Sequence, residues 1–315
     1  MPRRVLGKTG IAVSPFCFGT LTIGPGQANL SLKDGRELIA FALECGVNFF
    51  DTAELYGTYE YLDSRALPGL GDAVIASRSF AVTREEMARS LDLARKSMHR
   101  DVVDIFGLHQ QESGLTLKGH RDALDFLAEA KSRGWIKAVM VSTHHVACVR
   151  AAALMDEVDV IFAILNLEGL GIRDGTRQDM EEALSFASSC GKGVYVMKAL
   201  GGGHLYRRAR EALEYVRDLP FVSSVAVGVK SRAEVAFACS VLSGGEVPQA
   251  VEAETRGAPR RVVVEDWCVG CGECAKVCGF GAITLENGKA VVDPSKCMLC
   301  GYCSRVCPDF SIKVL

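Results

Sequence analysis

The sequence lacks the features that mark membrane, exported and nucleic-acid-binding proteins. Its net charge at pH 7 is −2, which gives no reason to expect nucleic acid or an anionic membrane as a partner. No run approaches the ~18 consecutive apolar residues of a membrane span, and no apolar stretch of signal-peptide length follows the opening MPRRVLGKTG. We therefore expect a soluble, cytoplasmic protein that acts on a small molecule. With 315 residues, of which 49% are hydrophobic, the chain is long enough for one large core and a small second module.

Cysteine is abundant but unevenly placed. Eight of the 13 cysteines fall within the last fifty residues, in two copies of the spacing C-x2-C-x2-C-x3-C. This is the bacterial spacing for two [4Fe-4S] clusters, in which each cluster takes three thiolates from one copy and the fourth from the other. The predicted ligands of one cluster are Cys268, Cys271, Cys274 and Cys307. Those of the second cluster are Cys297, Cys300, Cys303 and Cys278.

Zinc sites and disulfides are the alternatives for these cysteines. Zinc needs four ligands, usually in two separated pairs, which this spacing does not provide. Disulfides need an oxidising compartment, and the sequence has no visible export signal. The segments around the cysteines also repeat: strand-like runs at 262–264 and 291–292 precede each group, and runs at 283–285 and 312–314 follow. Residues 260–315 therefore resemble a bacterial two-cluster ferredoxin, although Gly279 replaces the proline that Pro308 provides in the second copy.

The other five cysteines occur singly in apolar surroundings. A structural role as a small buried side chain is the expectation for such residues. They are Cys17, Cys45, Cys148, Cys190 and Cys239.

Residues 1–242 alternate between short apolar runs and amphipathic helical patterns. Eight runs begin near residues 16, 47, 73, 102, 136, 160, 194 and 222. Between them lie helix signals such as the capping box of Thr83 and Glu86, which Ser231 and Glu234 repeat. Nearly all-apolar strands suit a parallel sheet that is covered on its faces. The pattern predicts an α/β fold, a (β/α)8 TIM barrel. An open doubly wound sheet is the alternative, but no GxGxxG turn follows the first strand.

The polar residues between the barrel and the cysteine module predict a linker. Residues 243–260 are small, polar and interrupted by Pro and Gly. The predicted domains are thus a barrel over 1–242, a linker over 243–260 and a small α+β ferredoxin-like domain with two [4Fe-4S] clusters over 261–315.

Catalytic residues of a TIM barrel lie at the carboxyl ends of its strands. The second strand ends at Asp51 with Tyr56 close behind, the third at Arg78 and the fourth at His109. An acid, a phenol, a cation and an imidazole would thus meet at one mouth. Taken singly, Asp51 could be a helix cap, Tyr56 a rim aromatic and His109 a core histidine.

Several stretches resemble the aldo-keto reductase family. The run DTAELYG is similar to the family's DTAxxYG motif, and RRVLGKTGIAVSPFCFGT resembles its opening hairpin and first strand. Barrels with a C-terminal ferredoxin-like module form a branch of this family, and the whole chain resembles that branch. The resemblance implies a catalytic tetrad of Asp51, Tyr56, Arg78 and His109, with hydride transfer from NADPH to a carbonyl and Tyr56 as the proton donor. A cation beside Tyr56 is expected to lower its pKa from about 10 toward working pH.

The chain departs from the family at the cofactor contacts. Arg78 stands where the family has lysine, and Thr143 follows Ser142 where the family has asparagine. Phe162 replaces a glutamine of the sixth strand, and Phe237-Ala238 replaces a Glu-Asn pair. These substitutions oppose NADPH binding, so NADPH is a candidate cofactor in doubt.

Other residues favour a phosphorylated ligand. The loops after the last two barrel strands often bind phosphate, and here they are rich in glycine and cations. With residues of the fifth and sixth strand ends, the predicted cofactor-binding set is Ser142, Asn166, Lys198, Gly201, Gly202, Lys230, Ser231 and Arg232. The alternative is a flexible glycine turn followed by an ordinary helix cap at Ser231. His144 and His145 are not expected to bind a metal, because adjacent side chains in a loop rarely share one ion.

Three functions remain open from the sequence. The first is an iron-sulfur oxidoreductase that reduces a carbonyl or related group with NADPH, while the clusters exchange electrons with a partner. The second is an NADPH-independent reductase that receives single electrons through the clusters from a ferredoxin or flavodoxin. The third is a non-enzymatic electron-transfer protein.

Overall fold

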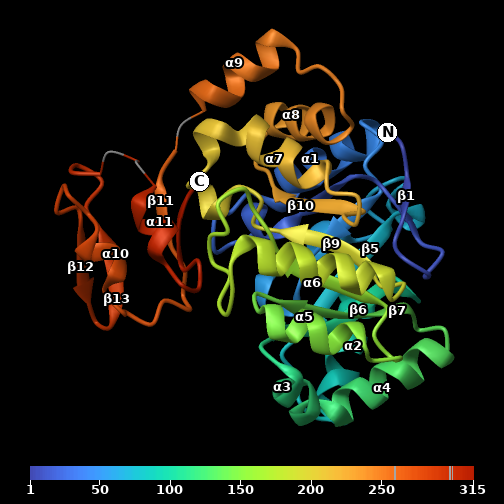
Figure 1. Ribbon diagram of the computed structural model, residues 1–315. Coiled ribbons are helices and arrows are strands. Elements are labelled where there is room, and N and C mark those ends of the chain that lie inside the picture. Colours follow the sequence, from blue (N-terminus) through green and yellow to red (C-terminus); the bar gives the residue numbers. More distant parts are fainter. Residues whose placement is uncertain (259, 298, 300) are drawn as a thin grey trace.

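Eight parallel strands close into a barrel in the computed structural model, which describes residues 1–258, 260–297, 299 and 301–315 (Figure 1). The strands are β3 (Phe16–Gly19), β4 (Phe49–Asp51), β5 (Val74–Ser79), β6 (Val103–Gln111), β7 (Ile136–Thr143), β8 (Val160–Ile164), β9 (Gly193–Met197) and β10 (Ser224–Gly228). Closure comes from β10, which pairs with β3 so that Val225 lies opposite Phe16. The closed order confirms the predicted TIM barrel, in which nearly all-apolar strands are buried on both faces.

Amphipathic helices surround the barrel and bury their apolar faces against it. They are α1 (Leu32–Glu44), α2 (Arg84–Met98), α3 (Gly114–Gly119), α4 (Arg121–Ser132), α5 (Val146–Ala153), α6 (Arg177–Ser189), α7 (Ala209–Arg217) and α8 (Arg232–Leu242). The predicted capping box opens α2: the Thr83 hydroxyl accepts a hydrogen bond from the Glu86 N–H, and the Glu86 carboxylate accepts one from the Thr83 N–H. Short 3₁₀ turns connect several elements, among them η2 (Glu54–Tyr56), η5 (Gly201–Gly203) and η6 (Tyr206–Arg208).

The opening hairpin packs into the barrel interior. Its strands β1 (Arg4–Val5) and β2 (Ala12–Val13) pair in antiparallel register. Leu6, Ile11 and Val13 share an apolar cluster with interior residues of the strands, including Phe49 and Tyr195. The opposite end of the barrel, where the strands end, is therefore left open for a site.

The linker segment contains a helix. Helix α9 (Gln249–Gly257) begins after Pro248 and lies outside α8 (Figure 1). Val247 and Val251 pack against the core that the barrel helices share. Residues 243–260 thus connect the modules while lying partly against the barrel.

The cysteine module is built from two similar halves. The first half consists of β11 (Val262–Val264), α10 (Glu273–Lys276) and β12 (Ile283–Glu286), and the second of β13 (Lys289–Val292), α11 (Tyr302–Val306) and β14 (Ile312–Val314). Strand β11 pairs with β14, and β12 pairs with β13. Each half is a strand, a cysteine-bearing turn and helix, and a return strand, as the sequence repeat predicts.

The cysteine module is docked on the barrel mouth through an aromatic anchor. Phe310 has 1% of its surface exposed and belongs to the main core of the barrel. A Cβ atom at Gly171 or Gly202 would collide with the Phe310 ring, and one at Gly203 would collide with the carbonyl oxygen of Val314 on β14. The close fit requires glycine at these positions because no other residue lacks a Cβ atom.

A buried ion pair lies at the same docking surface. Lys313 Nζ is 2.5 Å from Glu265 Oε1, and both side chains are almost fully buried. Gln27, from the loop after β3, donates a hydrogen bond to the same carboxylate oxygen at 2.6 Å. The barrel and the module therefore share one polar network.

Two of the five single cysteines do not lie alone. Cys45, at the end of α1, and Cys239, on α8, share a side-chain hydrogen bond. Cys17 and Cys148 are fully buried, and Cys190 is half-buried. Cys45 and Cys239 are single in the sequence but meet in the fold, because α1 and α8 are neighbours around the barrel; the structural role of the five cysteines stays a prediction.

Candidate active site

The four predicted catalytic side chains meet at the barrel mouth: Asp51, Arg78 and His109 come from the neighbouring strands β4, β5 and β6, and Tyr56 comes from η2. Arg78 on β5 donates from Nη1 to Asp51 Oδ2 at 2.7 Å and from Nη2 to the Tyr56 hydroxyl oxygen at 2.6 Å. Asp51 also accepts a hydrogen bond from the Tyr195 hydroxyl at 3.0 Å. The His109 ring lies 6.0 Å from the Tyr56 ring, edge to face. Arg78 is therefore fixed between an acid and a phenol.

Burial has the largest effect on the pKa values of Asp51, Tyr56 and Arg78. Burial raises the pKa of Asp51, although Arg78 opposes this rise. The pKa of Arg78 is raised by Asp51 and Tyr56 against the effect of burial, so its guanidinium stays charged. Burial also raises the pKa of Tyr56 above 10, and Arg78 offsets only part of that rise. The expected shift of the Tyr56 pKa toward neutral pH is therefore wrong in its net direction, although Arg78 acts in the expected sense.

His109 is a neutral side chain. Burial and the charge of Arg78 lower its pKa well below 6.5. The ring is stacked on Phe80 at a centroid distance of 4.3 Å, and its Nδ1 atom has no hydrogen-bond partner among the described residues. Such a histidine can orient a ligand by hydrogen bonding but brings no positive charge.

Two residues predicted to bind the cofactor, Ser142 and Asn166, have partners within the protein, as does Phe162, which replaces a glutamine of the family. Ser142 Oγ accepts a hydrogen bond from the Gln110 N–H, and both ends of the Asn166 amide bond to the backbone of Leu170. Phe162 stacks on Tyr195 at 4.0 Å and lies under the Arg78 guanidinium. These contacts hold strand ends and loops together without any ligand.

The predicted phosphate-binding residues lie in two places, in and before η5 after β9 and at the start of α8 after β10. Gly201 and Gly202 form η5 with left-handed backbone (φ +55° and +63°), and Gly202 faces Phe310 of the cysteine module. Ser231 caps α8 by accepting from the Glu234 N–H. Arg232 lies over the Phe41 ring, 5.0 Å from its centroid. Ser231 thus acts as a helix cap, and Gly202 takes part in the docking of the module, whereas Gly201 packs against Leu170 and Leu205.

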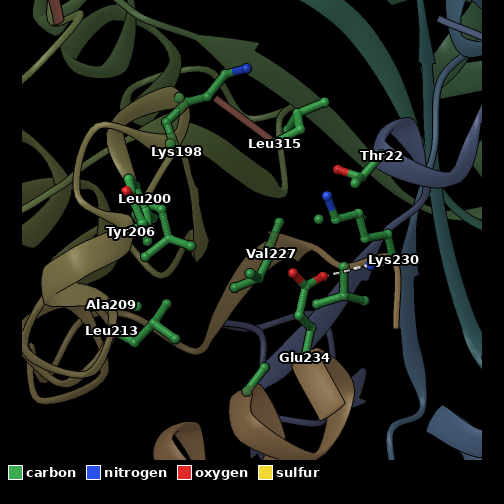
Figure 2. Close-up of a pocket in the computed structure, with 18 of the residues that line it drawn as sticks. Thr22, Lys198, Leu200, Tyr206, Ala209, Leu213, Val227, Lys230, Glu234 and Leu315 are labelled. Atoms are coloured by element: carbon green, nitrogen blue, oxygen red, sulfur yellow. Dashed lines mark hydrogen bonds between the residues drawn. The ribbon is translucent and has the colours of Figure 1, made fainter. Parts of the chain in front are cut away.

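A cavity of about 800 Å³ opens at the barrel mouth and extends toward α7 and α9. Asp51, Tyr56 and Arg78 lie along it together with Lys198 and Lys230. Figure 2 shows Lys198, which follows β9, and Lys230, which follows β10, approaching the cavity from different strand ends, with the Lys230 N–H bonded to Glu234. The cavity thus connects the predicted catalytic side chains to a strongly cationic region.

The cysteine module contributes residues to this cavity that sequence reasoning missed. Lys313, Val314 and Leu315 line it, and Lys313 is neutralised by Glu265. The alternation of β14 was visible in the sequence, but only the docked arrangement brings its lysine to the barrel mouth. The site is therefore built from both modules.

Four predicted cluster ligands surround a small separate cavity in the cysteine module. Its lining includes Cys268, Cys271, Cys274 and Cys307, which is the set predicted for one cluster. Among the described residues, no three His, Cys, Asp or Glu side chains converge on a single metal ion. A ring of thiols around a cavity fits a cluster better than one zinc ion.

Backbone amides point at the predicted ligand sulfurs. Ser311 N–H donates to Cys307 Sγ at 3.2 Å, and Ala282 N–H donates to Cys278 Sγ at 3.3 Å. Both donors follow their cysteine by four residues, so the two halves repeat the same contact. Hydrogen bonds to cluster sulfurs are one means by which proteins set reduction potentials. Cys297 and Cys303 lie in the second half, whereas Cys300 falls outside the described residues.

Comparison with known proteins agrees with this architecture. Residues 15–221 match the model of the aldo/keto reductase family. The chain belongs to that family. Residues 249–310 match a 4Fe-4S dicluster domain, so this member joins an aldo/keto reductase barrel to a ferredoxin-like domain.

Curated relatives match mainly over the barrel. L-galactose dehydrogenase from Arabidopsis thaliana is 26% identical over 216 residues, which cover 64% of this chain and 66% of that protein. A 6-dehydroglucose reductase from Novosphingobium aromaticivorans is 26% identical over 158 residues, covering 44% of this chain and 50% of that protein. The chain therefore spans half to about two thirds of the length of these relatives.

Solved structures support the barrel fold. An aldo-keto reductase from Pseudomonas aeruginosa superposes with a TM-score of 0.66 at 25% identity, covering 77% of this chain and 94% of that one. A second, from Bacillus halodurans in its holo form, has a TM-score of 0.67 at 16% identity and covers 81% and 95%. No helix among the described residues is long and apolar enough to cross a membrane.

Proposed function

We propose that this aldo/keto reductase family member is an iron-sulfur oxidoreductase that reduces a carbonyl or related group in the barrel cavity, with electrons entering through the two clusters. One arrangement carries the proposal. Tyr56 and Lys198 line one cavity, and Lys198 lies close enough to the predicted cluster ligand Cys307 for their charges to interact. This arrangement supports a path for electrons from a cluster held by Cys307 toward the cavity that Tyr56 lines.

The roles of the side chains follow from their contacts. Reduction of a carbonyl to an alcohol needs two electrons and two protons. When bound, the clusters would supply the electrons one at a time from an external ferredoxin or flavodoxin. Tyr56 would give one proton to the carbonyl oxygen, and water would give the other to the carbon. Arg78 would stabilise the resulting phenolate, while Asp51 holds Arg78 in place.

NADPH fits the described residues poorly. Ser142 and Asn166 are engaged by backbone groups, and Phe162 is fixed in a stack with Tyr195. These contacts support the route through the clusters without a nicotinamide. We expect no turnover with NADPH as the only reductant, and no micromolar binding in an anaerobic calorimetric titration of the cluster-loaded protein.

The NADPH-dependent route has one observation in its favour. The cavity is large, and Lys230 lines it at the predicted phosphate side. Tight calorimetric binding of NADPH, together with NADPH-driven reduction of a carbonyl, would establish this second candidate in place of the first.

Tyr56→Phe tests the proton donor in either route. The variant keeps the ring and loses the hydroxyl, so we expect turnover driven by reduced ferredoxin or flavodoxin to fall by about 10²-fold or more. The visible absorbance of the clusters should stay unchanged, because Tyr56 is not among their predicted ligands and phenylalanine keeps the ring. Unchanged turnover in this variant would remove Tyr56 from the mechanism.

A further inference from the structure

Two cysteines meet at the seam of the barrel, where the last strand β10 pairs with the first strand β3. Helix α1 follows β3 and helix α8 follows β10, and the two helices pack against each other (Figure 1). Cys45 ends α1 as its C-cap residue, and Cys239 lies on α8. Their thiols share a side-chain hydrogen bond, so the two sulfur atoms lie in contact across the seam.

Both thiols are partly accessible to solvent. Cys45 and Cys239 are half-buried, whereas Cys17 and Cys148 are fully buried. Cys190 provides a comparison within the chain, because it is also half-buried and also caps the end of a helix, α6. Helix α6 follows β8, which is two strands away from β10 in the barrel. Cys45 and Cys239 therefore combine access to solvent with a partner thiol.

Cys45 is the thiol of this pair that ionises first. Burial raises the pKa of Cys45, but the hydrogen bond that Cys239 donates to its thiolate opposes this rise, while the charge of Glu44 adds to it. Burial, then the charge of an ionised Cys45, raises the pKa of Cys239 to about 12, and the N-terminal amine opposes this rise. Because the thiolate is the form that attacks a disulfide, exchange at this pair begins at Cys45 and is slow near pH 7.

We propose that Cys45 and Cys239 form a reversible disulfide that locks α1 to α8 when the protein meets a low-molecular-weight disulfide as oxidant. The Cys45 thiolate attacks one sulfur of the oxidant, which gives a mixed disulfide and releases one thiolate. Cys239 then attacks the Cys45 sulfur and displaces the second thiolate. Two electrons pass from the two cysteines to the oxidant, and their two protons go to the two thiols that are released. Disulfides of this transient kind serve as redox sensors in reducing compartments.

The link would join two borders of the cavity at the barrel mouth. Gln27, in the loop before α1, lines this cavity together with Lys230 and Glu234 at the start of α8. The bond also joins segments that are far apart in the sequence, and such a link stabilises a fold mainly by restricting the unfolded chain. Oxidation should therefore raise the melting temperature.

The test treats the protein, with both clusters loaded and under anaerobic conditions, with glutathione disulfide at about pH 8.5. Free thiols are then blocked with N-ethylmaleimide, and a tryptic digest is analysed by mass spectrometry. We expect the two peptides that contain Cys45 and Cys239 to be recovered joined to each other, and Cys190 to be recovered alkylated or bound to glutathione. The melting temperature should rise by roughly 3–10 °C, and dithiothreitol should reverse both changes.

Cys239→Ser is the matched control, because serine has nearly the size of cysteine but cannot form the link. In this variant Cys45 should be recovered bound to glutathione, and the same treatment should not raise the melting temperature. Absence of the joined Cys45 and Cys239 peptides in the treated wild type would refute the proposed disulfide. A link that forms without raising the melting temperature above that of treated Cys239→Ser would refute the locking of α1 to α8. None of these measurements uses turnover, so they stand apart from the test of Tyr56.

Discussion

Docking of the cysteine module depends on Gly203, and Gly203→Ala should open the docked surface. Gly203 has φ +91°, and a Cβ atom there would lie well inside contact distance of the Val314 carbonyl oxygen. Alanine in a left-handed conformation costs about 1–2 kcal/mol, and forced displacement of packed groups adds about 1–3 kcal/mol. We expect a total cost of about 2–5 kcal/mol, because the obstructing atom belongs to the backbone of β14 and cannot rotate away.

Gly244→Ala separates the two contributions. Gly244 has a similar φ of +75°, but no atom of the residues that the structure describes lies within 4 Å of the position that the methyl group of alanine would take. Only the backbone cost of about 1–2 kcal/mol therefore applies. The free energy of unfolding from urea titration should fall for both variants, and by more for Gly203→Ala.

Acetylation of Lys313, followed by mass spectrometry, measures docking directly. Only 3% of Lys313 is exposed in the docked state, and exposed Lys33 serves as the internal standard. Gly203→Ala should raise the Lys313 rate roughly tenfold or more, since about 1.4 kcal/mol corresponds to a factor of ten. Gly244→Ala should leave it unchanged. Equal rates in wild type and Gly203→Ala would refute the docking argument.

Three further predictions concern buried charges. Among the described residues, Lys313→Met leaves the buried Glu265 carboxylate with Gln27 as its one side-chain hydrogen-bond donor. Urea titration should therefore record a loss of about 3 kcal/mol in the free energy of unfolding; no loss would mean that the pair is not buried in solution. Arg78→Met leaves Asp51 unpaired and removes the group that opposes the rise of its pKa. In the variant the pKa of Asp51 in the folded state is raised further above its unfolded value, so the folded protein is more stable when Asp51 is protonated. The melting temperature of Arg78→Met should therefore approach that of the wild type as pH falls toward 5 and fall further below it as pH rises. A difference in melting temperature that does not change with pH would contradict this. The pKa of Tyr56 is raised above 10, so the phenol keeps its proton and the turnover rate should not fall between pH 7 and about pH 10. A fall in the rate below pH 9 that persists at saturating substrate would point to another proton donor.

Local sequence patterns were sufficient to predict the strands of the barrel and the start of a helix. The apolar runs predicted all eight barrel strands, and the Thr83 capping box predicted the start of α2, because strand burial and helix capping depend on residues close in the sequence. The cysteine spacing likewise predicted the two halves of the module, since cluster ligands are fixed by short turns.

The convergence of the side chains predicted to be catalytic could be expected from a rule of topology. Asp51, Arg78 and His109 each end a strand, and parallel strands in a barrel end at one mouth. The net pKa of Tyr56 was not predictable, because it depends on how deeply the docked assembly buries the phenol as well as on Arg78.

The sequence by itself determined the barrel, the ferredoxin-like module and the residues at the strand ends, because each rests on short-range periodicity or spacing. Only the tertiary structure decided how the modules meet. The contact between Gln27 and Glu265 joins residues 238 positions apart, and no local pattern records such a pairing. The same docking places Gly202 against Phe310 and Gly203 against β14, a role that the sequence did not predict, because close approach between distant segments depends on three-dimensional packing.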